Sequence, residues 1–155
     1  MLLTGKRIAV LVAEGVEDLE FFVPCMRLQE EGADVVVAGL ELKPVRGKNG
    51  LEITPTGRVD ALKSGELFAV VVPGGWAPDK LRRYAAVKDL VREMDAERKT
   101  LAFICHGGHV AISAGIVKGR RATGTVAIKD DVENAGGTWV DAPAIREGHL
   151  VWGRV

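Results

Sequence analysis

Four short runs of hydrophobic residues mark the first two thirds of the chain. They are continuous rather than alternating with polar residues, and β-branched side chains are frequent in them. Runs of this kind are typical of parallel strands that helices cover on both faces of the sheet. We therefore predict buried parallel strands at residues 8–12, 35–40, 67–72 and 100–104.

Segments with helical periodicity lie between and after these strands. Residues 86–98 carry apolar side chains at i, i+3, i+4 and i+7, and a further helix is expected from Cys105 to a stop at Gly115. In residues 18–31, Pro24 predicts a kink or a first turn that starts late. The apolar residues that share one face of this first helix are Leu19, Phe22, Val23 and Met26.

The rest of the chain is richer in turn residues. Residues 43–56 hold Gly, Pro and Asn in a pattern that predicts short strands, with antiparallel pairing as one arrangement. Further along, residues 138–140 and 150–152 are strand-like, and a helix is expected near 129–135. The alternation of strands and helices indicates one open α/β sandwich with a mostly parallel central sheet.

Composition narrows the class of protein. A length of 155 residues fits a single domain, and 21 basic residues balance 21 acidic ones. Bulk charge therefore gives no reason to expect nucleic acid or an anionic membrane surface as a partner. No apolar run is long enough to span a bilayer, and the first residues lack the order of a signal peptide. Two cysteines do not suggest a disulfide framework, so a cytoplasmic location is the default expectation.

Cys105 is the strongest candidate for chemistry. It follows the fourth strand at the start of a helix, where unpaired backbone N–H groups favour negative charge. We therefore predict that its pKa lies well below the free value of about 8.5. His106 is a candidate general base or thiolate partner, and Gly107 with Gly108 permits a sharp turn. The alternative is a buried structural cysteine, which is our interpretation of Cys25.

Two acidic residues, Glu14 and Glu17, follow the first strand at the same edge of the sheet as Cys105. A carboxyl group that burial keeps protonated can donate a hydrogen bond to a cysteine sulfur. Capping of the first helix by Glu17 or Asp18 is the alternative interpretation.

Gly74 and Gly75 end the third strand, which we expect beside the strand of Cys105. Their N–H groups, with one from the turn after Cys105, could form an oxyanion hole. A plain strand-to-helix turn is the alternative. Neither a G-x-G-x-x-G nor a Walker pattern occurs, so these glycines do not predict a phosphate cradle.

A metal site is a weaker possibility at the same place. Cys105, His106 and His109 are close in sequence, but no further Cys or His lies nearby. Because a zinc site needs three or four protein ligands, we expect neither a metal nor another cofactor.

Several motifs together carry a family resemblance. The sequence Ala-Phe-Ile-Cys-His-Gly at 102–107, the Pro-Gly-Gly turn at 73–75 and Glu-Asp-Leu-Glu at 17–20 stand in order. With 128–131 and 134–136 downstream, they resemble the PfpI family of intracellular cysteine proteases. This family belongs to the wider DJ-one superfamily of deglycase and glyoxalase-like proteins. The resemblance covers nearly the whole chain and implies a flavodoxin-like three-layer α/β sandwich. We expect one such domain over residues 1–155, without the family's usual C-terminal helix.

The resemblance also implies a site. Cys105 would be the nucleophile, His106 its immediate partner, and Glu17 the family glutamate that hydrogen-bonds the sulfur. Asp79 stands where oligomeric family members carry a glutamate that reaches across a subunit interface to orient the histidine. A homo-oligomer, dimer or hexamer, with its site near the interface is therefore expected. Trp76 stands where relatives often have a smaller or basic residue, which predicts an altered pocket mouth.

Three functions remain open at this stage. The first is a thiol-dependent hydrolase that acts on glycated groups and reactive carbonyls such as methylglyoxal. The second is a cysteine peptidase in which Asp79 of a neighbouring subunit holds His106. The third is a redox-sensing or chaperone-like stress protein that uses oxidation of Cys105. Glycines 74, 75 and 107 would bind the oxyanion or substrate in either enzyme.

Overall fold

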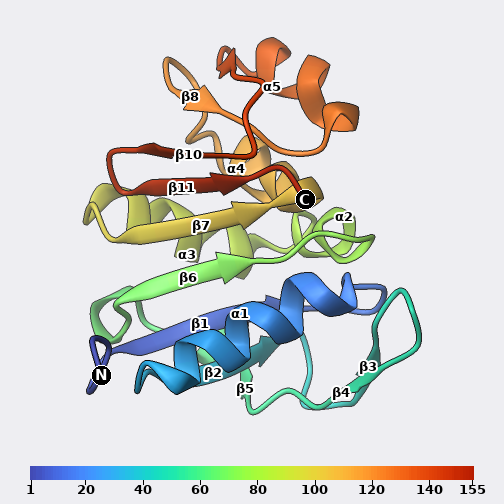
Figure 1. Ribbon diagram of the computed structural model, residues 1–155, viewed down its shortest axis with the longest axis vertical. Helices are drawn as coiled ribbons and strands as arrows, with labels where there is room; N and C mark the ends of the chain where they lie inside the picture. Colours follow the sequence, from blue (N-terminus) through green and yellow to red (C-terminus); the bar gives the residue numbers. More distant parts are fainter.

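The computed structural model describes residues 1–155, and a seven-stranded sheet forms its centre (Figure 1). The strand order is β10-β11-β7-β6-β1-β2-β5. Every neighbouring pair is parallel except β10 and β11, which form an antiparallel hairpin at one edge. The strands of this sheet are β1 (Arg7–Val12), β2 (Asp34–Gly39), β5 (Gly57–Arg58), β6 (Ala69–Val72), β7 (Thr100–Ile104), β10 (Ala144–Glu147) and β11 (Leu150–Gly153).

The four predicted strands are confirmed as β1, β2, β6 and β7. In β1 and β6 nearly every side chain is buried, because helices cover both faces of the sheet there. The pairing register sets Val10 beside Val71 and Val71 beside Ala102, so the carboxyl ends of the three central strands lie next to one another. This mostly parallel sheet with helices on both sides confirms the predicted flavodoxin-like class.

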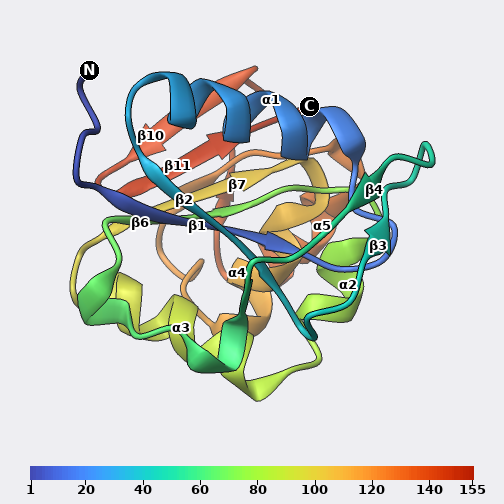
Figure 2. The same cartoon turned by 90° about the horizontal axis from the view of Figure 1, so that it is seen from below.

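The helices form the two outer layers (Figure 2). Helix α1 covers one face of the sheet, and α2, α3 and α4 cover the other. A small lobe of α5, β8 and β9 lies beyond the β10 edge. The bounds of these elements are α1 (Asp18–Glu30), α2 (Ala77–Leu81), α3 (Ala85–Ala96), α4 (Gly108–Ala114), α5 (Lys129–Asn134), β8 (Arg121–Ala122) and β9 (Thr138–Trp139).

Helix α1 differs from the sequence prediction in the face that it buries. It runs without a break through Pro24, and it packs on the sheet through Phe21 and Cys25, which are 3% and 6% exposed. The predicted apolar stripe points largely to solvent instead, with Leu19 and Val23 66% and 58% exposed. The stripe therefore marks an apolar outer surface of α1 and not its core face.

The segment after β2 forms the expected antiparallel pair, β3 (Val45–Arg46) with β4 (Glu52–Ile53). The pattern did not predict α2, β8 or β10, each of which is only two to five residues long and lacks a full period. Four 3-10 turns complete the chain, at Val59–Ala61, Ser64–Glu66, Cys105–Gly107 and Val126–Ile128.

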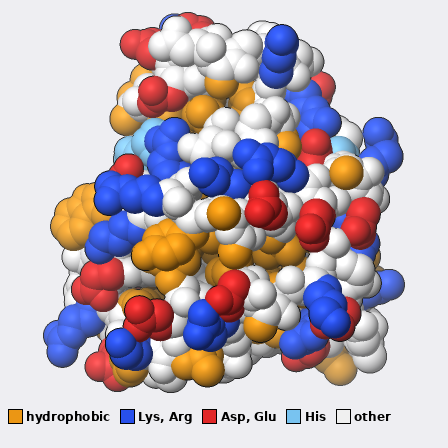
Figure 3. All heavy atoms as spheres, turned by 180° about the vertical axis from the view of Figure 1, so that it is seen from behind, with side chains coloured by type: hydrophobic (Ala, Val, Ile, Leu, Met, Phe, Trp, Pro, Cys, Tyr) orange, Lys and Arg blue, Asp and Glu red, His pale blue; other side chains and the backbone are white.

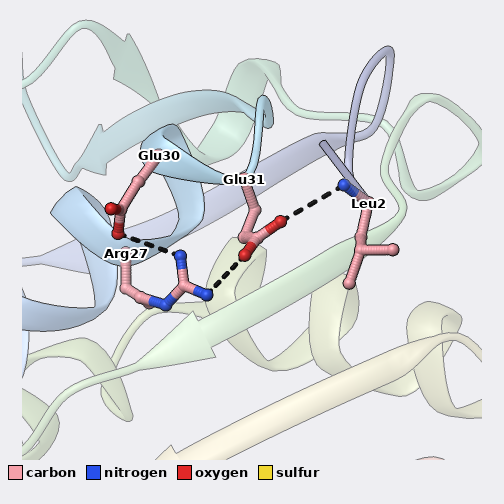
Figure 4. Close-up of polar contacts among 4 residues, drawn as sticks. All are labelled: Leu2, Arg27, Glu30 and Glu31. Atoms are coloured by element: carbon pink, nitrogen blue, oxygen red, sulfur yellow. Dashed lines mark hydrogen bonds and ion pairs between the residues drawn. The ribbon is translucent and has the colours of Figure 1, made fainter.

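The end of α1 is tied to the N-terminal segment (Figure 4). Arg27 pairs with both Glu30 and Glu31, and the other carboxylate oxygen of Glu31, Oε2, accepts the backbone N–H of Leu2 at 3.2 Å. On the face of the molecule that lies behind the view of Figure 1, acidic and basic side chains are intermingled (Figure 3). No helix has the length and hydrophobicity needed to cross a bilayer.

Candidate active site

The loops that follow β1, β6 and β7 meet at the carboxyl edge of the sheet. Backbone hydrogen bonds join the loops after β1 and β6. The Trp76 N–H donates to Gly15 O at 2.8 Å, and the Glu17 N–H donates to Gly74 O at 3.1 Å. An isolated bridge pairs Val16 with Gly75. These contacts fix the Pro-Gly-Gly turn against the loop after β1, as expected for a binding edge of an α/β sheet.

Cys105 occupies a strained turn between β7 and α4. Its φ of +56° lies in the left-handed region, which non-glycine residues rarely adopt. The turn is possible because small residues surround it. A Cβ on Gly107 would lie 2.2 Å from Val72 O, and one on Gly74 would lie 2.8 Å from the Cys105 Cβ. The sharp turn expected from the glycines is therefore present, and Cys105 as a whole residue is 9% exposed.

His106 is the direct partner of the thiol. Its Nδ1 lies 3.3 Å from Cys105 Sγ, which is hydrogen-bond distance for a sulfur group. Burial lowers the pKa of His106, and the positive charges of His109 and Lys48 lower it further. The imidazole is therefore neutral at neutral pH and has an acceptor nitrogen for the thiol proton. The His109 ring, 5.7 Å away centre to centre, pairs with Asp131 at 3.4 Å.

The carboxyl group that reaches the cysteine belongs to Glu20, not to Glu17. The Glu20 carboxyl group and Cys105 both lie against Gly74, and Glu20 Oε2 accepts the N–H of Gly74 at 2.7 Å. Glu17 instead caps α1 by accepting the N–H of Glu20 at 2.9 Å, and it accepts a bond from Asn49 Nδ2 at 3.0 Å. Glu17 therefore takes the capping role that was the alternative interpretation, one helical turn before Glu20.

The electrostatic setting of the thiol also differs from the expectation. Burial and the negative charge of Glu20 raise the pKa of Cys105 to about 11, although the N–H groups of His106 and Gly75 act in the opposite direction. The pKa of Glu20 is raised too, first by burial and then by the charge of Glu17. The prediction from the helix start is thus wrong in sign, because burial and a like charge outweigh a short helix. Activation must come through proton transfer to His106.

The three candidate glycines have separate positions. The Gly75 N–H, with that of His106, points at the Cys105 sulfur, where it can stabilise negative charge. The Gly74 N–H is already taken by Glu20, and Gly107 packs against the β6 backbone. Gly75 and His106 are therefore the donors placed for an oxyanion.

Asp79 does not contact His106 within the chain. It lies on α2, is largely exposed, and pairs with Arg83 one turn later. Its charge acts on His109, whose pKa burial lowers and the Asp79 charge raises slightly. A complete triad through Asp79 would require another subunit.

An open pocket of about 620 Å³ lies over Cys105 and His106. Its mouth is formed by exposed residues of α1 and by Trp76, which is 62% exposed. Lys48, from the loop between β3 and β4, also lines the pocket. The pocket is large enough for a small molecule and contains the thiol, the imidazole and a single cationic side chain.

The structure adds residues that the pattern did not single out. Glu20, three positions from Glu17, and Lys48, in a turn of Gly, Lys and Asn, gave no local signal stronger than that of a polar helix face or a loop. His149, in the turn between β10 and β11, is mostly buried, and its Nε2 lies 2.7 Å from Asp95 Oδ1. No cluster of three or more His, Cys, Asp or Glu side chains is arranged to hold a metal ion.

The sheet order and the cysteine in a strained strand-to-helix turn define a flavodoxin-like α/β protein with a candidate nucleophile at the carboxyl edge. The chain belongs to the DJ-1/PfpI family, whose sequence model matches residues 6–155. It is 39% identical to a deglycase of Thermococcus kodakarensis, over 96% of this chain and 89% of that one. Deglycase PfpI of Pyrococcus furiosus is 38% identical over the same shares.

A solved structure extends this likeness. A two-domain protein of Anabaena variabilis, with a DJ-1/ThiJ/PfpI-like and a ferritin-like domain, superposes with a TM-score of 0.95 and 38% identity. The match covers 96% of this chain and 43% of that protein, so this chain spans less than half of the two-domain protein.

Proposed function

We propose that the chain is a thiol-dependent hydrolase of the deglycase type, which acts on glycated groups and on reactive carbonyls such as methylglyoxal. The observation that carries the proposal is Cys105 Sγ, held in a strained turn 3.3 Å from a neutral His106 Nδ1 and open to a pocket. Relatives named deglycases, at 38% to 39% identity, support the same reading.

The first step uses the two residues that are in contact. As His106 Nδ1 takes the thiol proton, the sulfur forms a bond to the aldehyde carbon of methylglyoxal, and the carbonyl oxygen becomes a hydroxyl group of a hemithioacetal. The N–H groups of Gly75 and His106 face the sulfur and can stabilise the oxygen anion while it forms. For a glycated amine in its hemiaminal form, the sulfur–carbon bond forms and the carbon–nitrogen bond breaks, and the amine leaves with the proton that His106 took from the thiol.

The second step moves a proton within the adduct. A base removes the proton from the carbon bound to sulfur and returns a proton to the neighbouring carbonyl carbon, which gives a thioester. His106 and Glu20 are the groups in reach, and the raised pKa of Glu20 suits proton exchange. Water then cleaves the thioester to lactate and frees the Cys105 thiol, with no external oxidant or reductant.

Peptide hydrolysis through the same nucleophile is a second candidate, and Asp79 decides how it would work. Asp79 pairs with Arg83 inside the chain, so His106 lacks a carboxylate orienter unless a homo-oligomer supplies one. Oxidation sensing is less well supported, because burial and Glu20 keep the thiol protonated, and oxidation proceeds through the thiolate.

The test compares variants on methylglyoxal, a glycated amino acid and a peptide. We expect Cys105→Ser to abolish all turnover and His106→Ala to reduce it about 100-fold or more. Cys25→Ala, which removes the other thiol beneath α1, serves as the matched control and should retain activity. Equal carbonyl turnover in Cys105→Ser and the wild type would overturn the proposal. Peptide turnover unaffected by His106→Ala would exclude the peptidase reading.

A further inference from the structure

Lys48 places an unpaired positive charge in the candidate pocket. It is the only Lys or Arg among the pocket-lining residues, and no carboxylate lies within ion-pair distance of its ammonium group. The Nζ atom sits 5.9 Å from the centre of the Trp76 ring at the pocket mouth. Its charge reaches the centre of the site, because it contributes to the lowered pKa of His106 and opposes the rise in the pKa of Glu20.

The loop that carries Lys48 is held in place by a buried carboxylate. Asp18, 2% exposed at the start of α1, accepts the N–H of Asn49 at 2.7 Å and of Leu51 at 2.9 Å. Lys48 itself donates its N–H to Val16 O at 2.7 Å. The backbone under the ammonium group is therefore anchored to the same loop that supports the Pro-Gly-Gly turn.

The neighbouring acidic groups are already engaged. Glu17 is occupied by the Glu20 N–H and by Asn49, and Glu20 is bound to Gly74. The rest of the lining is mostly apolar, including Leu19, Val23 and Ile104. An anion entering this pocket would therefore meet one cation, Lys48, in the lining that also contains the candidate nucleophile.

We propose that Lys48 determines specificity by binding a carboxylate of the molecule whose reacting carbon lies at Cys105. The favoured substrate class is then a reactive dicarbonyl compound that also carries a carboxylate, over a neutral dicarbonyl compound such as methylglyoxal. The substrate class rests on the proposed function, whereas the binding of an anion beside the sulfur does not. Because attraction of this kind acts before any bond forms, it can be measured without turnover.

The experiment compares alkylation of Cys105 by iodoacetate and by iodoacetamide. In both reactions a sulfur–carbon bond forms, a carbon–iodine bond breaks and iodide leaves, so the probes differ in charge alone. The ratio of the two rate constants cancels any change in the thiolate fraction. We expect Lys48→Met to lower the iodoacetate to iodoacetamide ratio about tenfold, Lys48→Arg to keep it, and added salt to lower it in the wild type.

Lys43→Met is the matched control, because Lys43 lies on the neighbouring connection between β2 and β3 but pairs with the exposed Glu41 outside the pocket. Its ratio should equal that of the wild type. An unchanged ratio in Lys48→Met, or an equal fall in Lys43→Met, would overturn the inference. If Lys48→Met fails to fold, Lys48→Gln replaces it with the same expectation. Methylglyoxal turnover by the wild type, measured in parallel, separates the two proposals. If Lys48→Met lowers the iodoacetate to iodoacetamide ratio but the wild type shows no turnover, only the proposed function is contradicted. If the wild type shows turnover but the ratio is unchanged in Lys48→Met, only this inference is contradicted.

Discussion

The Oε2 atom of Glu20 accepts the backbone N–H of Gly74 at 2.7 Å, and the pKa of the neighbouring Cys105 thiol is raised by burial and then by the charge of the same carboxyl group. One side chain from α1 thus connects the turn after β6 with the candidate nucleophile after β7. A carboxylate in this place holds the geometry, but its negative charge opposes ionisation of the sulfur. The Glu20 carboxyl group is therefore better placed to exchange protons with a substrate than to stabilise a thiolate in the resting enzyme.

Replacement of this carboxyl group should therefore make Cys105 more acidic. In Glu20→Gln the amide oxygen can still accept the Gly74 N–H, while the amide NH₂ group donates to the sulfur and no negative charge remains. The pKa of Cys105 should fall below its value of about 11. At pH 8 we expect alkylation by iodoacetamide about tenfold faster than in the wild type, measured as a pH profile. Turnover of methylglyoxal should nevertheless fall, because a proton carrier is lost.

Glu17→Gln is the matched comparison one helical turn away. Because Glu17 caps α1 and does not touch the sulfur, this variant should leave the alkylation profile in place and lower the free energy of unfolding by about 1 kcal/mol. A shifted profile in Glu17→Gln, with none in Glu20→Gln, would show that the positions assigned to the two carboxylates are reversed.

Gly107 offers a test of the turn that carries the cysteine. A Cβ at this position would lie 2.2 Å from Val72 O, so Gly107→Ala must push the Cys105 turn away from β6. We expect about 2 kcal/mol of destabilisation in chemical unfolding, together with lost activity. Gly65→Ala is the control, since no atom lies within 4 Å of its added Cβ. Equal stability of the two variants would contradict this account of the turn.

The strands and the site edge could be predicted from sequence because they depend on local signals. Continuous apolar runs such as 67–72 leave few alternatives to a buried strand, and the parallel order then brings their carboxyl ends together. Cys105, His106 and the Pro-Gly-Gly turn follow those ends directly, so the strand assignment alone brings them together.

The rotation of α1 could not be predicted in the same way. Leu19 and Val23 share a face, but so do Phe21 and Cys25, and periodicity alone does not say which face meets the sheet. The same uncertainty explains why Glu17 was predicted at the sulfur and Glu20 was found there, because residues one turn apart project in similar directions from the helix. The pKa of Cys105 depended on this contact, so its direction could not be predicted either.

Asp18 is expected to make folding stability depend on acid. Burial raises the pKa of Asp18, but the N–H donors of Asn49 and Leu51 outweigh burial and hold the pKa below its usual value of 3.8. Its contribution is therefore complete at pH values above about 3.8 and is lost as the pH falls through the lower folded-state pKa. Asp18→Asn, which places an amide NH₂ group against one of these donors, should lower stability by about 2 kcal/mol at pH 7.

The measurement is urea unfolding of wild type and Asp18→Asn at pH 7 and near pH 3. The difference in the free energy of unfolding should shrink at the acidic pH, because protonation weakens the wild-type acceptor as well. Asp130→Asn, at an exposed position of α5, is the control and should be neutral at both values. A difference that is the same at both pH values would argue against a charged Asp18 as the loop anchor.

Asp95 joins three parts of the chain far from the candidate site. Its carboxylate pairs with Arg120 and accepts a hydrogen bond from His149 Nε2 at 2.7 Å, which connects α3 to the turn between β10 and β11. Asp95→Ala leaves both donors without their acceptor, so we expect about 2 kcal/mol of destabilisation in thermal or urea unfolding. Asp89→Ala, in an exposed pair with Arg92 on the same helix, should change stability by less than about 0.5 kcal/mol. Because this network is remote from Cys105, the rate at which Cys105 is alkylated in folded Asp95→Ala should equal the rate in the wild type. A large fall in that rate would show that the two regions are coupled.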